Sequence, residues 1–456
     1  MNLYQDLYQI FKNENNVSQE LNILLDHSKD HSSYHPSHLP EVVVFPENKA
    51  DVIKILNYAN ENKIPVVPFG LGTSVEGQVI PIKGGISMNM TRMNKIIEIQ
   101  PDNFLVKVEP GVTRVQLNDY LKEHHLHFPI DPAIDASIGG MVSTNASGTN
   151  SVRYGAMKDQ VLGMQIILAN GEELNVGGQY LKSSSGYNLT NLFVGSEATL
   201  GVFTEITLRV YSIPKYKLTA MVEFTDLISA SNAVLKMKKR DLSIEKVELI
   251  DERTIEAINR YKSRSFSIAP FLFLELGGNE VIVHHDYELA KEALIEEGCI
   301  NIQLATNDLD RENLWEIRHE VAFAIKSMNP EKKLMTTDVC VPLNAMPNAI
   351  NETRKMMDNS KIECAILGHV GDGNFHAVFS VDPENKSEVG LYKKINEQIV
   401  DYALKNGGTC SGEHGIGLGK IDYMYKQHGN SVSYMRQIKS LFDPNNIMNP
   451  SKIFKK

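Results

Sequence analysis

Two histidines that flank a predicted tight turn are the first candidates for chemistry in this chain. The apolar runs 364–370 and 375–381 are separated by the sequence GDGN. Asp-Gly between two such runs predicts a β-hairpin with a two-residue loop at Asp372-Gly373. In that register His369 faces His376 across the strands, with Cβ atoms about 4.5–5.5 Å apart. Two imidazoles at this spacing could bind one metal ion, although a pair of core histidines in a hairpin would show the same pattern.

A second candidate is the charged pair Glu413-His414, which lies in the glycine-rich sequence GGTCSGEHGIGLGK. A charged pair is unusual in such a stretch. A carboxylate that joins two histidines would give a three-ligand metal site with open positions for a substrate. His414 is the direct neighbour of Glu413, so its side chain would normally point elsewhere.

A third candidate is a glycine turn in residues 65–77, PVVPFGLGTSVEG. The apolar residues before the turn predict a short strand. Gly70, Gly72, Thr73 and Ser74 could then present several backbone N–H groups to one anion. The turn matches neither the dinucleotide fingerprint G-x-G-x-x-G nor the Walker loop.

The most unusual stretch in composition is residues 131–155, DPAIDASIGGMVSTNASGTNSVRYG. It has no charged residue from Ala136 to Val152 and is dominated by Gly, Ala, Ser and Thr. Apolar residues inside it, such as Ile138 and Met141, distinguish it from a flexible linker. Glycine lets a backbone approach a flat or anionic group closely, so the stretch indicates a ligand contact. A buried turn of small residues is the alternative.

The glycine turn and the uncharged stretch together resemble the FAD-binding domain of the vanillyl-alcohol oxidase / p-cresol methylhydroxylase flavoproteins. Residues 186–210, GYNLTNLFVGSEATLGVFTEITLRV, are similar to the closing segment of that domain. GHVGDGNFH at 368–376 and GEHGIG at 412–417 resemble the D-2-hydroxy acid dehydrogenase branch of the family. The resemblance covers about residues 38–456.

The resemblance implies an α+β fold. It comprises a two-part FAD-binding domain of the p-cresol methylhydroxylase type and an α+β substrate domain, or cap, with a largely antiparallel sheet. The C-terminal tail is expected to return to the FAD-binding domain. We therefore expect an N-terminal helical extension over 1–37, the FAD-binding domain over 38–213, the cap domain over 214–425 and the C-terminal segment over 426–456.

Apolar periodicity predicts the individual elements. The expected strands are 42–45, 65–69, 85–90, 96–99, 105–108, 161–169, 172–176, 203–210, 218–224, 246–250, 271–276, 300–305 and 335–342. The expected helices are 49–62, 113–121, 229–238, 287–296 and 311–326.

The resemblance also assigns residues to the cofactor. Thr73 stands where several members of the family carry the histidine that bonds FAD covalently, so we expect non-covalent FAD. The residues implied in FAD binding are Pro68, Gly70, Leu71, Gly72, Thr73, Ser74, Gly77, Pro132, Asp135, Ser137, Ile138, Gly139, Gly140, Thr144, Asn145, Ser147, Gly148, Tyr154, Gly155, Glu197, Gly201, Val202 and Asn449.

The same resemblance gives roles to the candidates for chemistry. His414 would be the general base, for which a neutral imidazole is suited near pH 7. Arg318 and Asn374 would contact the substrate carboxylate. One divalent metal ion, Zn or Mn, would be held by His369, His376 and Glu413.

The strand predicted at 335–342, MTTDVCVP, restricts the range of possible substrates. It contains no lysine, whereas the 2-hydroxyglutarate enzymes of the family carry one there for the distal carboxylate. We therefore expect oxidation of a short D-2-hydroxy acid, D-lactate or glycolate, to the 2-oxo acid, with hydride passing to flavin N5. Electrons would leave to a quinone, a cytochrome, an electron-transfer flavoprotein or an iron–sulfur subunit, and not to NAD.

Three alternatives stay open. The protein could be a D-2-hydroxyglutarate-type dehydrogenase. It could be a flavin subunit with an iron–sulfur partner, either that of a multi-subunit glycolate oxidase or one that transfers electrons without oxidising a substrate itself. It could also be a metal-independent flavin oxidase that acts on an alcohol or a sugar.

Bulk composition restricts partners and location. A net charge of −10 over 456 residues argues against nucleic acid as a partner. Four dispersed cysteines without a CxxC motif are typical of reduced thiols, and the N-terminus has no long apolar run. We expect a cytoplasmic protein; peripheral membrane association and a homodimer stay open.

Overall fold

The computed structural model describes residues 2–32, 34–360 and 362–455, and the chain forms two compact units. Unit 1 comprises Met1–Ser147, Gly155–Ile213 and Glu413–Lys456. Unit 2 comprises Gly148–Tyr154 and Pro214–Gly412. The second stretch of unit 2 begins at Pro214, where the cap domain is expected to begin. The chain joins unit 1 at residue 413, before the expected end of the cap domain at 425.

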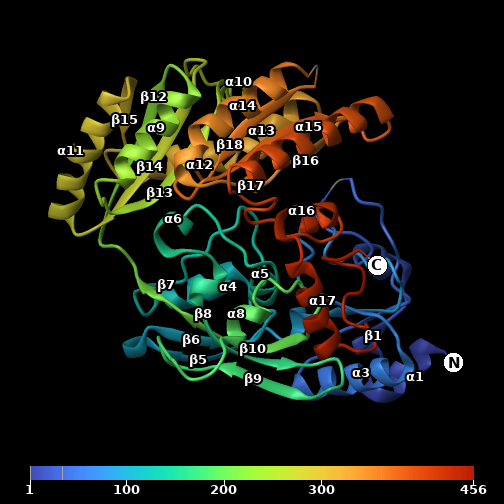
Figure 1. Ribbon diagram of the computed structural model, residues 1–456. Helices are drawn as coiled ribbons and strands as arrows, with labels where there is room; N and C mark the ends of the chain where they lie inside the picture. The colour runs from blue at the N-terminus through green and yellow to red at the C-terminus, as the bar shows by residue number, and fades with distance from the viewer. Residues whose placement is uncertain (1, 33, 361, 456) are drawn as a thin grey trace. The chain divides into compact units, whose positions relative to one another are not determined.

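A mixed sheet forms the N-terminal part of unit 1 (Figure 1). Its strand order is β1-β2-β4-β3, in which β2 and β3 run parallel to β4, and α3 connects β2 to β3. The side chain of Asn48 caps α3, and the helix buries an apolar stripe that includes Val52 and Leu56. The bounds are α1 Leu3–Phe11, β1 Val17–Ser18, α2 Leu21–Asp26, β2 Val42–Val44, α3 Lys49–Asn62, β3 Val66–Phe69 and β4 Ile86–Asn89.

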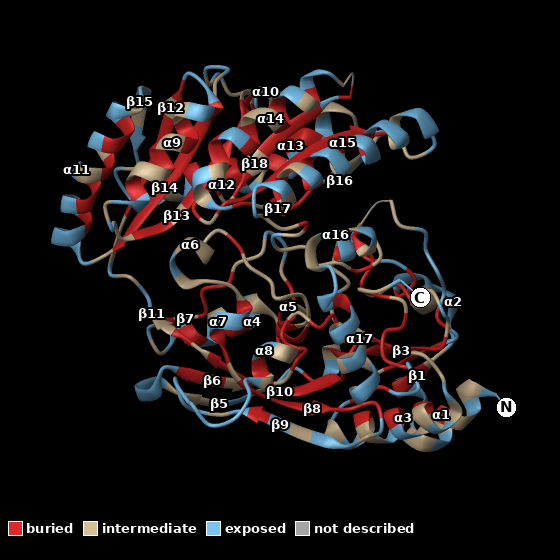
Figure 2. Ribbon diagram, viewed as in Figure 1, coloured by how far each residue is buried: buried red, intermediate tan, exposed pale blue. Residues whose placement is uncertain are grey.

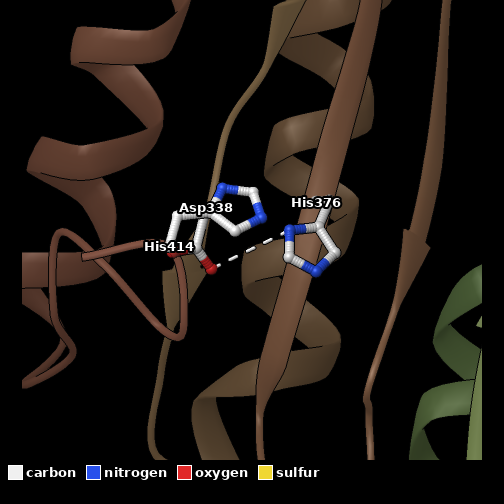
Figure 3. Close-up of side chains that lie close together, drawn as sticks. All are labelled: Asp338, His376 and His414. Carbon is white, nitrogen blue, oxygen red and sulfur yellow. Dashed lines mark ion pairs between the residues drawn. The ribbon is translucent and has the colours of Figure 1, made fainter. Parts of the chain in front are cut away.

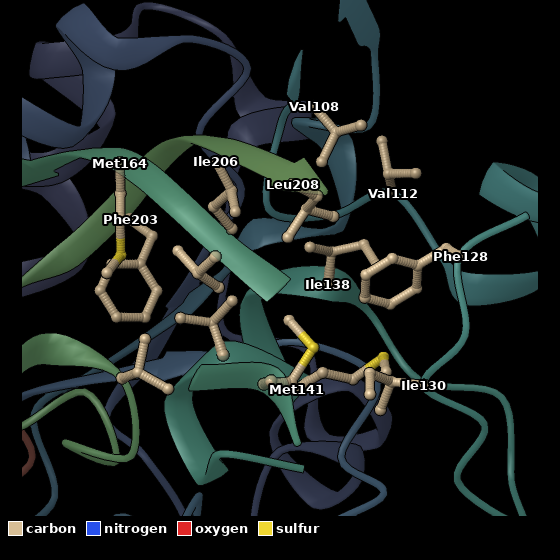
Figure 4. Packing of buried hydrophobic residues seen from close by; sticks show 14 of the residues in the cluster. Val108, Val112, Phe128, Ile130, Ile138, Met141, Met164, Phe203, Ile206 and Leu208 are labelled. Atoms are coloured by element: carbon tan, nitrogen blue, oxygen red, sulfur yellow. The ribbon is translucent and has the colours of Figure 1, made fainter. Parts of the chain in front are cut away.

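An antiparallel sheet with the order β5-β6-β10-β8-β9 forms the second part of unit 1. Its apolar face packs on the short helix α5 to make one core (Figure 4). The bounds are β5 Ile96–Gln100, β6 Leu105–Val108, α4 Arg114–Lys122, β7 Leu126–His127, α5 Ile138–Thr144, α7 Met157–Gln160, β8 Val161–Ile167, β9 Glu173–Gly177, α8 Leu189–Phe193, β10 Val202–Arg209 and β11 Tyr211–Ser212.

The C-terminal segment completes unit 1, as the resemblance implies. After α16 (Met424–His428) and α17 (Ser431–Phe442), the chain pairs with β3. Val66 N donates to Ile447 O, and Asn449 N donates to Val66 O, each at 2.8 Å.

Unit 2 is built on an antiparallel sheet with the order β15-β12-β14-β13-β18-β19-β16, and β17 also pairs with β19. Its inner strands are almost wholly buried, whereas the edge strand β15 is largely exposed (Figure 2). The strands are β12 Tyr216–Phe224, β13 Ile244–Ile250, β14 Phe271–Gly278, β15 Cys299–Leu304, β16 Lys333–Thr336, β17 Val339–Cys340, β18 Cys364–Gly368 and β19 Asn374–Val381.

The helices of unit 2 differ from the expectation in two ways. The expected single helix at 311–326 is two helices, α12 and α13, which meet at Glu320. Four further helices, α6, α10, α14 and α15, were not predicted. The bounds are α6 Ser151–Tyr154, α9 Leu227–Lys238, α10 Glu252–Lys262, α11 Glu280–Glu296, α12 Asp308–His319, α13 Val321–Met328, α14 Met346–Asp358 and α15 Lys386–Lys405.

One face of this sheet is covered by α10, α12 and α13, which form an apolar core with it. Register places further residues on the same face, because directly paired residues share a face. Phe273 of β14 belongs to the core and is paired with Glu248 of β13. Ile250 of β13 also belongs to the core and is paired with Leu367 of β18, which in turn faces His376. Glu248 and His376 therefore lie on the helix-covered face.

The register of the β18–β19 hairpin corrects the prediction. Leu367 lies opposite His376, so the expected pairing of His369 with His376 is wrong by two residues. The loop spans 369–373 and not only Asp372-Gly373. Gly373 has φ +87 and approaches the backbone of Val341, where a Cβ would collide. A shift of two residues keeps each side chain on its face, so His369 stays on the side of His376.

Asp443 should be essential to the stability of unit 1. Its carboxylate is buried, accepts from Ile447 N and Met448 N, and pairs with Lys439. Asp443→Ala leaves the Lys439 charge buried without its partner, which costs about 3–5 kcal/mol. For a domain of 150–250 residues, thermal unfolding should move down by roughly 6–20 °C. The control is Asp422→Ala, which removes an exposed carboxylate. Equal melting temperatures of the two variants would contradict this assignment.

Candidate active site

The two hairpin histidines lie against each other in unit 2. Their ring centroids are 5.6 Å apart and their planes are nearly perpendicular. His376 projects from β19, whereas His369 follows the end of β18. Both side chains are mostly buried, with exposed fractions of 13% for His369 and 6% for His376.

The Glu248 carboxylate orients His369. Glu248 lies on β13 and has no exposed side-chain surface. Its Oε1 is 2.7 Å from His369 Nδ1. A carboxylate can only accept, so Nδ1 carries the proton and Nε2 keeps its lone pair. Metal-binding histidines commonly show this arrangement, because the outer hydrogen bond fixes the ring and its tautomer.

A backbone carbonyl orients His376 in the same way. His376 Nδ1 is 3.2 Å from Thr337 O, which can only accept. Asp338 Oδ1 is 3.8 Å from the same nitrogen, and Asp338 is fully buried (Figure 3). Both histidines thus have a lone pair on Nε2, the donor that a divalent metal ion requires. The two residues fit a metal site.

Arg318, the predicted carboxylate binder, is bound to the same glutamate. It projects from α12 and is 9% exposed. Its Nε and Nη2 donate to Glu248 Oε2 at 3.0 and 2.7 Å. Glu248 therefore joins Arg318 to His369. Two of the five guanidinium N–H groups are used in this pair.

Asn374, the second predicted substrate contact, lies at the start of β19 and is buried. Its Nδ2 donates to Asp338 Oδ1 and to Val339 O, each at 2.8 Å. Its Oδ1 has no hydrogen-bond partner among the described residues. The side chain thus offers an acceptor to a ligand, whereas a substrate carboxylate would require a donor.

In unit 1, the glycine turn meets the uncharged stretch. A Cβ on Gly70 would overlap the Ser137 hydroxyl, so glycine is required for this contact. The turn is also held from the N-terminal extension by the buried carboxylate of Asp30. Asp30 Oδ2 accepts from Gly77 N at 2.6 Å and from Ser74 Oγ at 3.1 Å. No sequence pattern indicated this contact.

The uncharged stretch contains helix α5, which was not predicted. Ser137 caps its N-terminus by accepting from Gly140 N. Gly139 packs on Pro110, where a Cβ would collide, and Ile138 and Met141 enter the core. Small residues are therefore needed here for packing as well.

The other predicted FAD residues are distributed over both units. Gly148 and Tyr154 belong to unit 2, and all the others belong to unit 1. Asp135 accepts from Val115 N in the first turn of α4. Pro68 lies in β3, Thr144 ends α5, Val202 begins β10, and Leu71, Thr73, Pro132, Asn145, Gly155 and Gly201 lie in connecting segments.

The glycine-rich segment places Glu413 and His414 among buried polar groups of unit 1. Glu413 Oε2 accepts from Ser147 Oγ at 2.7 Å. Gln78 Nε2 donates to the His414 carbonyl at 2.7 Å. The carboxylate of Glu76 is 4.0 Å from His414 Nδ1.

Glu197 and Asn449 form a further buried network. Glu197 accepts from Ile416 N at 2.6 Å and from Gly417 N at 2.8 Å. Asn449 Nδ2 donates to the Glu197 carbonyl, and Lys452 donates to Asn449 Oδ1. Burial raises the pKa of Glu197 to about 7, and burial lowers the pKa of Lys452 to about 8.

Several of these residues were missed by sequence reasoning, among them Glu248, Asp338, Gln78 and Lys452. For the first two a signal existed. Each is a carboxylate inside a predicted strand, KVELI at 246–250 or MTTDVCVP at 335–342, and a carboxylate that is buried there needs a partner. Gln78 and Lys452 have no comparable signal.

Comparison with known proteins places the chain in a family. Residues 213–453 match the family described as "FAD linked oxidases, C-terminal domain", and residues 40–177 match the "FAD binding domain". The chain belongs to the FAD-linked oxidases. This oxidase is 38% identical to a probable mitochondrial D-lactate dehydrogenase of Danio rerio, over 94% of this chain and 86% of that one. It is 31% identical to glycolate oxidase subunit GlcD of Bacillus subtilis, over 92% and 90%.

Its fold is that of p-cresol methylhydroxylase. A substrate-bound structure of that enzyme matches with a TM-score of 0.79 and 19% identity, over 98% of this chain and 96% of that one. The α+β fold expected from the resemblance is thereby confirmed. Within the described residues, no helix combines the length and apolarity that a membrane span requires.

Gly72 tests the assignment of the glycine turn. It has φ +69 and faces the Phe69 ring, so both Gly72→Asp and Gly72→Asn are strained. Only the aspartate adds a charge that repels the FAD pyrophosphate. We expect Gly72→Asp to purify without flavin and Gly72→Asn to retain a larger fraction. Flavin is measured by absorbance after acid precipitation of the protein. Normal flavin content in Gly72→Asp would show that the turn has been misassigned.

Proposed function

We propose that this FAD-linked oxidase oxidises a short D-2-hydroxy acid, D-lactate or glycolate, to the 2-oxo acid with the help of one divalent metal ion. The observation that carries the proposal is the histidine pair, in which Glu248 and Thr337 O each hold one Nδ1. The names of the relatives, D-lactate dehydrogenase and glycolate oxidase subunit, support the substrate class.

The metal ion, Zn or Mn, would be held by Nε2 of His369, Nε2 of His376 and the carboxylate of Glu413. The first two fit because their tautomers provide lone pairs on Nε2. The position of Gly412 supports the assignment of Glu413 as the third ligand. Gly412 N donates to Asp338 Oδ2 at 2.8 Å, and Glu413 is the next residue in the chain. Two nitrogens and one oxygen leave coordination positions for a substrate.

When bound, the flavin would supply the hydride acceptor, its N5, and the metal ion held by His369, His376 and Glu413 would supply a Lewis acid for the substrate oxygens. His414 accepts the proton of the C2 hydroxyl as general base. The C2 hydrogen leaves with its electron pair, and the C2–O bond becomes the carbonyl of the 2-oxo acid. Ser147 holds one carboxylate oxygen of Glu413.

Arg318 would bind the substrate carboxylate through N–H groups that Glu248 does not use. A guanidinium held on one edge presents its other edge in a fixed orientation. Asn374 Oδ1 would accept a hydrogen bond from the substrate or a bound water, because its donors are engaged by Asp338 and Val339.

Flavin binding would be non-covalent, because Thr73 provides no nucleophile for attachment. Flavin that stays on the acid-precipitated chain would contradict this. The reduced flavin would pass its electrons to a quinone, a cytochrome, an electron-transfer flavoprotein or an iron–sulfur subunit. The expected cytoplasmic location is not supported, since named relatives from Danio rerio and Arabidopsis thaliana are mitochondrial.

A second candidate is the flavin subunit of a multi-subunit glycolate oxidase, which the name of the Bacillus subtilis relative favours. Such a subunit would reduce its flavin with glycolate and pass electrons to an iron–sulfur partner. Electron transfer from the substrate-reduced protein to a soluble quinone or cytochrome, with no other protein added, would count against this candidate.

The substrate and the metal are tested together. Under anaerobic conditions D-lactate or glycolate should bleach the flavin absorbance of the purified holoenzyme, and L-lactate should not. Chelation should stop the bleaching but leave the flavin bound. His369→Ala and His376→Ala should each mimic chelation, with the exposed His285→Ala as control. If either hairpin variant keeps both metal and activity, the metal site is wrong.

His414 is tested by substitution with asparagine. His414→Asn should retain metal and FAD, because the proposed ligands are unchanged. Flavin reduction by D-lactate should slow by roughly 10²–10⁴-fold, the usual contribution of a positioned general base. Stopped-flow absorbance measures the rate, and metal analysis excludes a ligand role. An unchanged rate would show that another residue is the general base. Loss of the metal would show that His414 is a metal ligand.

A further inference from the structure

The segment that carries Glu413 and His414 has little intrinsic rigidity. Residues 411–420 include four glycines and contain neither helix nor strand. Gly415 and Gly417 have positive φ values of +80 and +47. Glycine loses the most conformational freedom on folding, and functional side chains on a loop need support from neighbouring groups. The order of this segment must therefore come from hydrogen bonds to other parts of the chain.

One anchor precedes the charged pair. In unit 2, Asp338 Oδ2 accepts from Ser411 Oγ at 2.9 Å and from Gly412 N at 2.8 Å. Asn374 Nδ2 donates to the other oxygen. A Cβ at residue 412 would collide with the Asn374 side chain, so glycine allows the close approach.

The second anchor follows the charged pair and lies in unit 1. Glu197 accepts from two consecutive amides, Ile416 N and Gly417 N, with one carboxylate oxygen each. Gln78 joins the same anchor, because its Nε2 donates to His414 O while its Oε1 accepts from Glu76 N. Glu197 and Gln78 are 3% and 4% exposed.

Asp338, Glu197 and Gln78 are all buried and all bond to this segment. A buried carboxylate is costly unless donors satisfy its oxygens, and here the donors come from the segment on both sides of Glu413-His414. The chain passes from unit 2 to unit 1 between Gly412 and Glu413. The two anchors thus fix the segment at its exit from one unit and after its entry into the other.

We propose that Asp338 on one side, and Glu197 with Gln78 on the other, are positioning residues that hold Glu413 and His414 for catalysis. The proposal rests on the proposed function, since it gives Glu413 to the metal and His414 to proton transfer. The anchors act on different neighbours: Asp338 fixes the main chain before Glu413, and Glu197 and Gln78 fix His414 and the residues after it.

Substitutions in the two anchors should therefore have different effects on catalysis and metal binding. In Glu197→Gln, the amide NH₂ faces one of the two N–H groups, so one hydrogen bond is lost. We expect metal content as in the wild type and, in the flavin-loaded protein, a KM for D-lactate within about twofold and flavin reduction slowed about tenfold or more. In Asp338→Asn we expect metal affinity to fall about 10–100-fold in competition with a chelator, while flavin content stays unchanged.

Two exposed acids provide controls. Glu205→Gln in β10 and Asp308→Asn in α12 remove partly or largely exposed carboxylates and should leave both readouts within twofold. If Glu197→Gln does not fold, Gln78→Met removes the bonds to His414 O and from Glu76 N and should slow flavin reduction with an unchanged KM. If Asp338→Asn does not fold, Ser411→Ala removes one donor to Asp338 and should weaken metal binding. Wild-type values in these substitutes would overturn the proposal.

A double-mutant cycle separates this proposal from the proposed function. If Glu197 acts through His414, Glu197→Gln should slow flavin reduction in the wild type but by less than twofold in His414→Asn. Equal slowing in both backgrounds would overturn the positioning role, because Glu197 would then act elsewhere. A wild-type reduction rate in His414→Asn would instead overturn the assignment of the base, whatever Glu197→Gln does.

Discussion

The oxygens of a buried carboxylate need hydrogen-bond donors. The donors to Glu248 are the two side chains on which the proposed chemistry depends, those of His369 and Arg318. One oxygen accepts a hydrogen bond from Nδ1 of His369, and the other accepts two hydrogen bonds from N–H groups of Arg318. This single carboxylate therefore fixes the tautomer of His369, a proposed metal ligand. It also fixes the orientation of the Arg318 guanidinium, which is proposed to bind the substrate. Removing it would leave Arg318 as a buried charge without its partner, a strongly destabilising change.

The same use of buried acids recurs in both units. Asp338, Glu197 and Asp443 each accept from two backbone amides or from an amide and a hydroxyl. In each case the acid immobilises a segment that has no helix or strand of its own. These acidic side chains are turned to donors inside the protein. The structure uses carboxylates to position irregular backbone.

Sequence reasoning predicted the fold correctly and selected the candidate site residues because both leave local signals. Asp-Gly between apolar runs correctly predicted the β18–β19 hairpin, and alternation kept His369 and His376 on one face although the register was wrong by two residues. The wider loop depends on the close approach of Gly373 to Val341, which is a tertiary contact. Helix α5 was missed because glycine and serine have low helix propensity, and its packing on Pro110 is what favours it.

Contacts between distant residues could not be predicted. Glu248 is 121 residues from His369 in sequence, and Gln78 is 336 residues from His414. No periodicity or motif predicts a contact between residues so far apart in sequence. A charged residue inside a buried strand indicates only that its side chain needs a hydrogen-bond or ion-pair partner. The division of the chain at residue 413 was missed for the same reason, since the segment that follows is held by Glu76, Gln78 and Glu197.

In the proposed site two histidines, each oriented through Nδ1, present Nε2 to one metal ion that also binds the substrate. X-ray absorption spectroscopy at the metal edge of the holoenzyme, without and with D-lactate, reports the metal ligands. We predict two imidazole nitrogens bound to the metal, oxygen in the remaining positions, and a change of the oxygen ligands when D-lactate is added. A shell without imidazole, or one that contains cysteine sulfur, would contradict it.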